Sequence, residues 1–297
     1  MELTLEGLSK QFHGKTAVDN ISARLNEGVY GFLGANGAGK TTTMQMICGL
    51  ISPTVGEVKV DGKNNIGMGE DFRDLLGYLP QEFGYTVGFT AMEFLLYIAS
   101  IKGLNPRYAK MKAEELLNLV NLSSETNHKI RTFSGGMKRR LGIAQALLND
   151  PKILILDEPT AGLDPKERIY FRSIISQMAK DKIIIISTHI VSDVEYNSDE
   201  IVMMKKGKII CKDSANDLVK RIEGAVWSCR VPEEGWVLFE KHHCISNLHN
   251  YRDYIEARVI SENKPCQDAI TVEPTLEDLY LSCFYDETDG EGGRIDV

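Results

Sequence analysis

The stretch Gly34-Ala35-Asn36-Gly37-Ala38-Gly39-Lys40-Thr41 decides the fold of this chain. It matches the pattern GxxxxGK followed by Ser or Thr, between an apolar run, Val29–Leu33, and a segment expected to be helical from Lys40 to about Leu50. Glycines in such a turn let backbone N–H groups point inward around phosphates, and the helix N-terminus adds its positive dipole end. We therefore predict a phosphate loop in which Lys40 reaches the β- and γ-phosphates and Thr41 ligates Mg²⁺.

A second motif is an apolar run that ends in two acids, Ile153-Leu154-Ile155-Leu156-Asp157-Glu158. A buried strand with this sequence would deliver Asp157 to a metal ion and Glu158 towards an attacking water. A surface acid pair after a strand is the alternative interpretation. Together with the phosphate loop, the motif predicts a nucleoside-triphosphatase, and the two motifs alone leave adenine and guanine open.

The spacing of apolar residues predicts an α/β fold. The runs Ile153–Leu156 and Ile183–Ser187 flank a helix expected from about Lys166 to Lys180, which is the rhythm of a parallel sheet buried on both faces. Residues 1–25 alternate apolar and polar side chains, which predicts antiparallel strands. The phosphate loop and this spacing predict an α/β fold with a P-loop nucleoside-triphosphatase core and an antiparallel β subdomain, followed by a mostly helical stretch. The other expected elements are strands at Val55–Val60 (followed by the turn Asp61-Gly62) and Gly77–Leu79, helical segments from Thr90 to about Leu122, and a helix from Ser134 to Leu148.

The character of the sequence changes around Lys220–Gly224. We predict a main domain at 1–220, a small α+β accessory domain at 221–285 and a disordered acidic tail at 286–297, because the tail has too few apolar residues to pack. The expected accessory strands are Ala225–Val231, Tyr254–Ile260 and Ala269–Val272, and the expected helices are Trp236–Lys241 and Thr275–Cys283.

Composition excludes several classes of function. A formal net charge of -8 disfavours nucleic acid as the main partner. The six cysteines form no CxxC pair and no secretory signal is visible, so reduced thiols are expected. The spacing of His242, His243, Cys244 and His249 fits no common zinc pattern and is attributed to chance. No apolar run approaches the roughly 18–20 residues that span a bilayer, so we expect any action at a membrane to require a partner.

A third motif narrows the family. Phe133-Ser134-Gly135-Gly136-Met137-Lys138-Arg139-Arg140 opens a helix about twenty residues before Asp157. With Leu147-Leu148 and Pro151 after it, and then Asp157-Glu158-Pro159-Thr160, it resembles the signature of the ATP-binding cassette (ABC) family. The other marks of the family follow in order along the chain. They are Phe12 at the position of an adenine-stacking aromatic, Gln81 of Tyr78-Leu79-Pro80-Gln81 as the Q-loop, Ala161-Gly162-Leu163-Asp164 as the D-loop, and His189 of Ser187-Thr188-His189 as the switch histidine.

The resemblance implies that the helical stretch at about 88–148 is the helical subdomain of the family, and it implies a mechanism and a set of site residues. Two cassettes would sandwich Mg-ATP head to tail, with Ser134 of one chain facing the γ-phosphate held by the other, and Glu158 would be the general base. The implied catalytic residues are Glu158, His189 and Gln81. The implied metal ligands are Thr41, Gln81 and Asp157. The implied nucleotide-binding residues are Phe12, Gly34, Asn36, Gly37, Ala38, Gly39, Lys40, Thr41, Thr42, Ser134, Gly135, Gly136 and Asp164.

One position departs from the family pattern. Met137 stands where members often have Gln, which removes an expected side-chain contact but leaves those of Ser134 and the backbone. The basic run Lys138–Arg140 is interpreted as a solvated helix face near an anionic ligand, with a lipid-binding patch as the alternative.

Three kinds of cassette ATPase compete. Ribosome-associated members usually carry two cassettes in one chain. Chromosome and repair members insert long coiled coil after the Q-loop, whereas about fifty residues without heptads separate Gln81 from Ser134 here. A transporter motor is therefore favoured, acting with a separate membrane permease from the cytoplasmic side, at the inner face of the cell membrane. Ser134–Leu141, Ala161–Pro165 and Glu273–Leu281 resemble bacterial exporter-type cassettes often linked to drug, antibiotic-peptide or sodium efflux.

Overall fold

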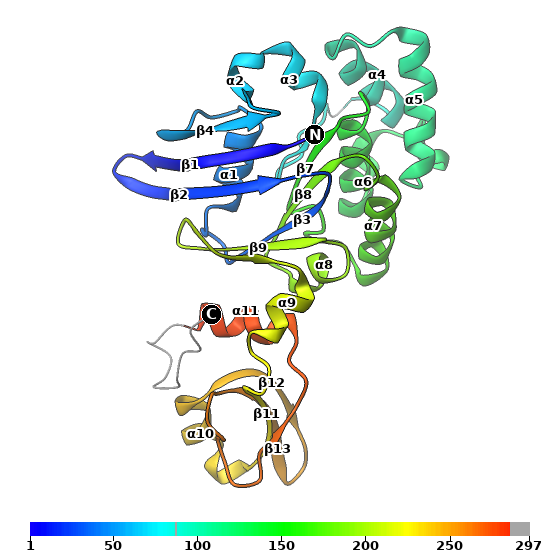
Figure 1. Ribbon diagram of the computed structural model, residues 1–297. Helices are drawn as coiled ribbons and strands as arrows, with labels where there is room; N and C mark the ends of the chain where they lie inside the picture. The colour runs from blue at the N-terminus through cyan, green and yellow to red at the C-terminus, as the bar shows by residue number, and fades with distance from the viewer. Residues whose placement is uncertain (87, 286–297) are drawn as a thin grey trace. The chain divides into compact units, whose positions relative to one another are not determined.

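Residues 1–86 and 88–285 are described by the computed structural model (Figure 1). The chain divides into two units between Ile210 and Cys211. This boundary lies inside a strand, about ten residues before the change of character in the sequence. The domain limits 1–220 and 221–285 stay predictions, and the predicted tail 286–297 lies outside the described residues.

The main sheet of the first unit is built from the apolar runs. β3 (Gly28–Leu33) pairs in parallel with β8 (Ile183–Thr188), which pairs in parallel with β7 (Ile153–Asp157). All residues of β7 and β8 are buried, which explains their unbroken apolar sequences. The predicted parallel sheet is confirmed. The strand order is β10-β9-β3-β8-β7-β6, with β6 at Leu76–Leu79, β9 at Glu200–Lys205 and β10 at Lys208–Asp213; the sequence analysis did not predict β9 and β10.

A second sheet of the first unit is antiparallel, as predicted for residues 1–25. β1 (Leu3–Phe12) pairs with β2 (Lys15–Leu25) and with β4 (Val55–Val60), and β5 (Lys63–Asn64) follows β4 through the expected turn. One hydrophobic core joins this sheet, the helix α1 (Lys40–Ile47) and one face of β7 and β8. The phosphate-loop helix is therefore held between the two sheets.

Helices cover the other face of the main sheet and form the helical subdomain (Figure 1). The segment Thr90–Leu122 is divided into two helices because Gly103 (φ 72°) and Asn105 interrupt it, and Asn105 caps the second helix. Thr90 starts the first with the capping box that its Glu93 completes. Two short helices, α2 (Asn65–Met68) and α3 (Glu70–Leu75), pack instead on the core shared with the antiparallel sheet. The remaining helices of the first unit are α4 (Ala91–Ile101), α5 (Pro106–Leu119), α6 (Gly135–Ala146), α7 (Pro165–Met178) and α8 (Val191–Glu195), with 3-10 turns at Ser123–Glu125 and Ile130–Thr132.

The second unit contains an antiparallel sheet of order β12-β13-β11-β14. The predicted strands and helices are present, and β12 was not predicted, because its outer half is exposed and polar. The imidazoles of His242 and His243 contact carbonyl oxygens of Leu238 and Phe239 in their own helix, at 2.7 and 2.8 Å. The elements are α9 (Ala215–Lys220), β11 (Val226–Pro232), a 3-10 turn (Glu233–Gly235), α10 (Trp236–His242), β12 (Cys244–Asn250), β13 (Tyr254–Ile260), β14 (Ile270–Thr271) and α11 (Leu276–Phe284).

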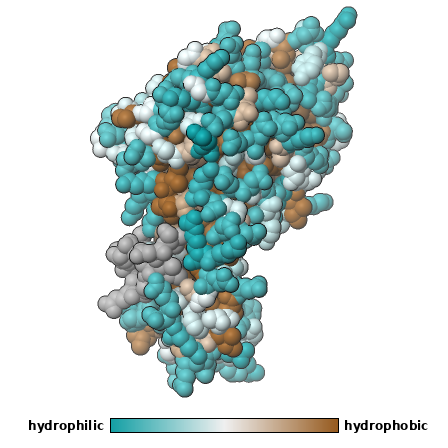
Figure 2. Space-filling view, in the orientation of Figure 1, coloured by the Kyte–Doolittle hydropathy of each residue, from teal (hydrophilic) through white to brown (hydrophobic). Residues whose placement is uncertain are grey.

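Across 1–86 and 88–285, none of the helices combines the length and the apolar character needed to cross a bilayer. The face drawn in Figure 2 is mostly hydrophilic, with hydrophobic residues in small separate groups.

An ion pair between a partly exposed arginine and a buried aspartate stabilises the second unit. Arg258 donates to both carboxylate oxygens of Asp278, at 2.8 and 2.7 Å, and Ser246 and the Thr275 N–H donate to the same carboxylate. Burial would raise the pKa of Asp278, but these hydrogen bonds outweigh it and hold the pKa below its ordinary value. The carboxylate therefore stabilises the folded unit above about pH 4, the pKa of an unfolded Asp, and this stabilisation is lost as the pH falls through the folded-state pKa.

Asp278→Asn is expected to lower the free energy of unfolding of this unit by about 1.5–3 kcal/mol at pH 7, the usual contribution of a hydrogen bond to a charged group, because Arg258 loses its charged partner. The protein's two tryptophans, Trp227 and Trp236, both lie in the second unit, so urea unfolding followed by tryptophan fluorescence reports on it. The difference from the wild type should shrink below pH 4. Asp268→Asn, at an exposed position, is the matched control, and equal unfolding midpoints for the two variants would contradict the prediction.

Candidate active site

The glycine-rich turn joins β3 to α1 and depends on two of its glycines. A Cβ on Gly34 would lie 2.4 Å from the carbonyl oxygen of Met204. Gly39 has a φ of 102°, and a Cβ there would lie 2.6 Å from the carbonyl oxygen of Ala17. Both positions therefore need glycine. Within the described chain no side chain caps α1 at Gly39, so the N–H groups of its first turn are available to an anion.

The other predicted residues of this turn line its rim. Asn36 and Gly37 are exposed, Ala38 is buried, and Thr41 and Thr42 are half-buried in the first turn of α1. This arrangement leaves the tip of the loop and the first turn of the helix accessible to a ligand. Nucleotide contacts by these residues stay predictions.

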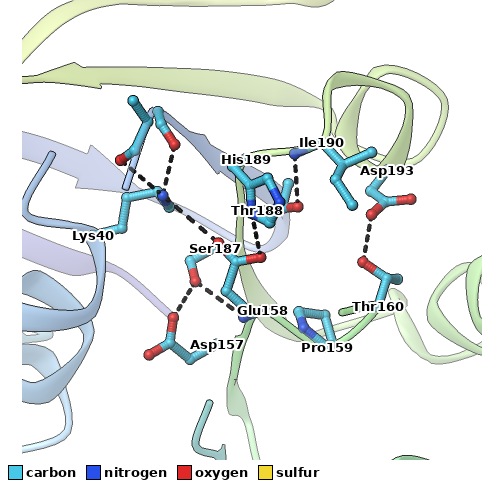
Figure 3. Close-up of polar contacts among 12 residues, drawn as sticks. Lys40, Asp157, Glu158, Pro159, Thr160, Ser187, Thr188, His189, Ile190 and Asp193 are labelled. Carbon is cyan, nitrogen blue, oxygen red and sulfur yellow. Dashed lines mark hydrogen bonds and ion pairs between the residues drawn. The ribbon is translucent and has the colours of Figure 1, made fainter. Parts of the chain in front are cut away.

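Lys40 lies buried below the turn, with 6% of its surface exposed. Its ammonium donates to the carbonyl oxygens of Gly34 and Ala35, at 2.6 and 3.3 Å, and lies 3.6 Å from Oε1 of Glu158 (Figure 3). Burial lowers the pKa of Lys40, and the neighbouring carboxylate of Glu158 opposes that shift. The phosphate loop and the strand motif that ends in Asp157 and Glu158 therefore meet at one buried cation, Lys40.

Glu158 has an unusual backbone that its neighbours hold in place. It is a non-glycine residue with a φ of 49°, a conformation that costs free energy. Its N–H donates to the carbonyl oxygen and the hydroxyl of Ser187, at 3.0 and 3.2 Å. The Ser187 hydroxyl also donates to Oδ1 of Asp157, and Nδ1 of His189 lies 2.9 Å from Oε2 of Glu158 (Figure 3). Both acids and the histidine thus lie at the ends of β7 and β8.

The arrangement around Asp157 fits a hard divalent cation. Its second carboxylate oxygen, Oδ2, is buried and has no hydrogen-bond partner among the described residues. A buried carboxylate oxygen is costly unless a donor or a cation meets it, and carboxylate and hydroxyl oxygens are the ligands that Mg²⁺ prefers. Asp157 is therefore suited to the metal that the sequence predicts.

The signature residues lie at the N-terminus of α6. The Ser134 hydroxyl accepts from the N–H of Met137 at 3.1 Å and so caps the helix. Ser134 and Gly135 are exposed. Gly136 is buried because the carboxylate of Glu167 lies against it, and a Cβ there would lie 2.1 Å from that carboxylate. An exposed helix N-terminus is a suitable surface for an anion.

Three predicted residues stay apart from the Lys40 cluster. Asp164 caps α7 by accepting from the N–H of Glu167 at 2.8 Å. Phe12 lies at the end of β1, 42% exposed, with the Lys10 ammonium 5.1 Å from its ring centre. Gln81 follows β6 with an exposed side chain. Within residues 1–86 and 88–285, no hydrogen bond links the side chains of Asp164 and Gln81 to Lys40, Asp157 or Glu158.

Comparison with known proteins identifies the family. A sequence model described as ABC transporter matches residues 18–161. The uncharacterized ABC transporter ATP-binding protein YxlF of Bacillus subtilis is 40% identical over 238 residues, which is 79% of this chain and 79% of that protein. The chain belongs to the ABC transporter family. The bacitracin transport ATP-binding protein BcrA of Bacillus licheniformis is 37% identical to this ABC protein over 84% of this chain and 81% of its own.

Solved structures agree with this ABC assignment. The ATP-binding subunit of an ABC transporter superposes with a TM-score of 0.68 and 26% identity, over 74% of this chain and 93% of its own. The dimeric post-hydrolysis cassette MJ0796, bound to ADP and Pi, has a TM-score of 0.66 and 25% identity, over 71% and 98%. The protein is thus an ABC ATPase, the ATP-binding subunit of a transporter, and the family and α/β fold predicted from the sequence are confirmed.

The structure of this ABC protein corrects the interpretation of Lys138–Arg140 as a solvated face. Lys138 lies over the ring of Tyr85, 5.1 Å from its centre, and Arg140 lies 3.8 Å from the Glu167 carboxylate. Arg139, however, is only 8% exposed and points into the cassette. A charged residue is buried when enough acceptors surround it, and sequence spacing alone does not reveal them.

Sequence reasoning also missed polar residues that support the site. Ser187 was noted only as a neighbour of His189, yet it contacts both acids. Thr160 donates to the fully buried carboxylate of Asp193, which Arg172 approaches to 3.5 Å. This contact ties the loop after Glu158 to α8. Their signal in the sequence is weak, because Ser, Thr and Asp are common at the ends of strands and helices.

Proposed function

We propose that this cassette is the motor of an exporter: it binds Mg-ATP between two copies of the chain, hydrolyses it with Glu158 as general base, and drives a separate membrane permease. The observation that carries the proposal is the convergence of Lys40, Glu158 and His189 at the mouth of the phosphate loop. Beside them, Oδ2 of Asp157 is buried and has no hydrogen-bond partner among the described residues, which supports Asp157 as a metal ligand.

The chemistry follows from the charges in this cluster. A triphosphate competes with the two carbonyl oxygens and Glu158 for the Lys40 ammonium, because it carries more negative charge than they do. Glu158 then faces the attacking water and takes its proton while the oxygen attacks the γ-phosphorus and the bond to ADP breaks. Mg²⁺, held by Asp157 and Thr41 with Gln81, would neutralise charge on the β- and γ-phosphates. His189 orients Glu158 through their 2.9 Å contact.

The signature helix supports the dimer. Ser134 and Gly135 present an exposed helix N-terminus. Among the described residues, no hydrogen bond joins these two residues to Lys40, Asp157 or Glu158. A second copy would bring this terminus to the γ-phosphate, where Asp164, also at an exposed helix N-terminus, would assist. The relative MJ0796 has been solved as a dimer, which supports the same arrangement here.

Relatives support export and a membrane partner. They include BcrA, the linearmycin resistance ATP-binding protein LnrL of Bacillus subtilis and a Nod factor export ATP-binding protein of Rhizobium leguminosarum. The proposed place of action is the cytoplasmic face of the cell membrane, on a permease encoded by another chain. These relatives do not favour the alternative, a non-transport cassette ATPase acting on ribosomes or nucleic acid.

Affinity purification of the tagged full-length chain from detergent-solubilised native membranes is expected to recover a polytopic membrane protein. Membranes that lack the tagged chain are the control. Recovery of ribosomes or DNA without a membrane protein would contradict the transporter proposal and favour the alternative.

A further inference from the structure

All three guanidinium nitrogens of Arg139 donate hydrogen bonds to main-chain carbonyl oxygens. Nε donates to the carbonyl oxygen of Pro159 at 3.2 Å, and Nη1 donates to those of Pro80 and Gln81 at 3.2 and 2.7 Å. Nη2 donates to those of Asp157, at 2.8 Å, and Glu158. An arginine has five N–H donors, so every donor has a main-chain acceptor.

The five acceptors belong to two segments that follow neighbouring strands. Pro80 and Gln81 follow β6, the residues from Asp157 to Pro159 end β7, and β6 pairs with β7. Arg139 comes from a third element, α6, five residues after Ser134. One side chain therefore joins the signature helix, the Q-loop and the segment that carries the two acids.

Three of the five contacts surround Glu158, the residue with the strained backbone. Glu158 has the φ of 49°, and Arg139 binds the carbonyl groups of Asp157, Glu158 and Pro159, directly before, at and after it. A conformation of this kind persists only when surrounding contacts hold it. Hydrogen bonds from a charged donor are about twice as strong as neutral ones, so Arg139 and Ser187 together fix this turn.

Burial lowers the pKa of Arg139, and the negative charges of Asp157 and Glu158 oppose the shift. A guanidinium keeps its proton in proteins, so the group remains a full donor. In the described part of the chain, all the hydrogen-bond partners of this guanidinium are main-chain carbonyl groups.

We propose that Arg139 is a positioning residue for ATP hydrolysis: it holds the backbone of Glu158 and of Gln81 in one fixed relation to each other and to the signature helix. The proposal rests on the proposed roles of Glu158 and Gln81. A displacement of about 1 Å in a reacting group can cost roughly 10²-fold in rate. Losing the hydrogen bonds from Arg139 to the backbone should therefore lower kcat while leaving the phosphate loop intact.

Arg139→Lys tests the role of the five hydrogen bonds from Arg139 to the backbone, because lysine keeps the charge but has at most three donors on one nitrogen. We expect kcat to fall about 10–100-fold, with the Kd for ATP within about threefold of the wild type, since Lys40 and the turn are untouched. The matched control is Arg258→Lys, which changes another partly buried guanidinium, in the second unit, and should leave kcat unchanged. Arg139→Gln, with two amide donors, provides a second variant if the first does not fold.

A purely structural role would lower the melting temperature without changing kcat per folded, ATP-binding molecule, and that result would overturn the proposal. A double-mutant cycle with Gln81→Ala adds a sharper readout. If Arg139 acts partly through Gln81, Arg139→Lys must cost less in the Gln81→Ala background than in the wild type. Additive losses would overturn the link to the Q-loop.

Different results would refute the two proposals, Glu158 as the general base and Arg139 as a positioning residue. A Glu158→Gln variant with normal hydrolysis removes the base assignment, whatever Arg139→Lys does. An inactive Glu158→Gln variant together with a wild-type kcat for Arg139→Lys would refute only the positioning role of Arg139 and leave Glu158 as the proposed base.

Discussion

Glu158→Gln is expected to lower the rate of ATP hydrolysis by roughly 10²–10⁴-fold, the usual contribution of a general base. Glutamine keeps the size of the side chain and can still meet His189, but it cannot take a proton from water. Glu158 is 5% exposed and directly follows the buried strand β7, so bulk water offers no easy substitute for its carboxylate.

Phosphate release under saturating Mg-ATP measures this rate, and nucleotide affinity is measured on the same sample. Affinity should survive, because Lys40 and the backbone N–H groups of the turn are unchanged. Glu70→Gln, at a side chain 91% exposed, makes the same chemical change away from the site and should hydrolyse normally. A normal rate for Glu158→Gln would remove Glu158 as the base.

Lys40→Ala is expected to weaken ATP binding about 10²-fold or more. Truncating a buried charged donor to a phosphate costs roughly 2–5 kcal/mol, and each 1.4 kcal/mol is about tenfold in Kd. The loss should come without unfolding, because burial already disfavours the charged Lys40 and lowers its pKa. In the variant, His189 remains as a partner of the buried Glu158 carboxylate, so the fold should be retained.

Titration with a fluorescent ATP analogue, alongside a thermal melt, separates the two effects. Lys208→Ala, which removes an ammonium 64% exposed beside Asp19, should change neither quantity. Wild-type affinity for Lys40→Ala would exclude Lys40 from phosphate binding, and a large drop in melting temperature would mean that its role is structural.

Local chemistry made much of the fold predictable. The turn Gly34–Thr41 needs glycine at particular backbone angles, and the runs in β7 and β8 are apolar throughout because both faces are buried. Both signals are contained in a few consecutive residues. β12 was missed because its register shifts between Ile245 and Asn247 and its outer half is exposed, so no alternation is visible.

A site residue could be predicted where its position follows from the neighbouring sequence. It could not be predicted where its contacts are with backbone groups far away in the chain. The acids Asp157 and Glu158 could be predicted from their position at a strand end. Arg139 could not, since its acceptors lie 18–20 and 58–59 residues away in the chain. Contacts of Ser134 with nucleotide would require a second copy of the chain, and they stay predictions.

The most direct test of the ATP-bridged dimer is the molar mass of Glu158→Gln measured by size-exclusion chromatography with light scattering. With Mg-ATP at high protein concentration, uncleaved nucleotide should hold two 33.2 kDa chains together, because Lys40 of one chain and Ser134 of the other bind the same phosphates. With ADP, the same sample should run as a monomer. A variant that binds ATP, does not hydrolyse it and remains a monomer at every concentration would contradict the sandwich.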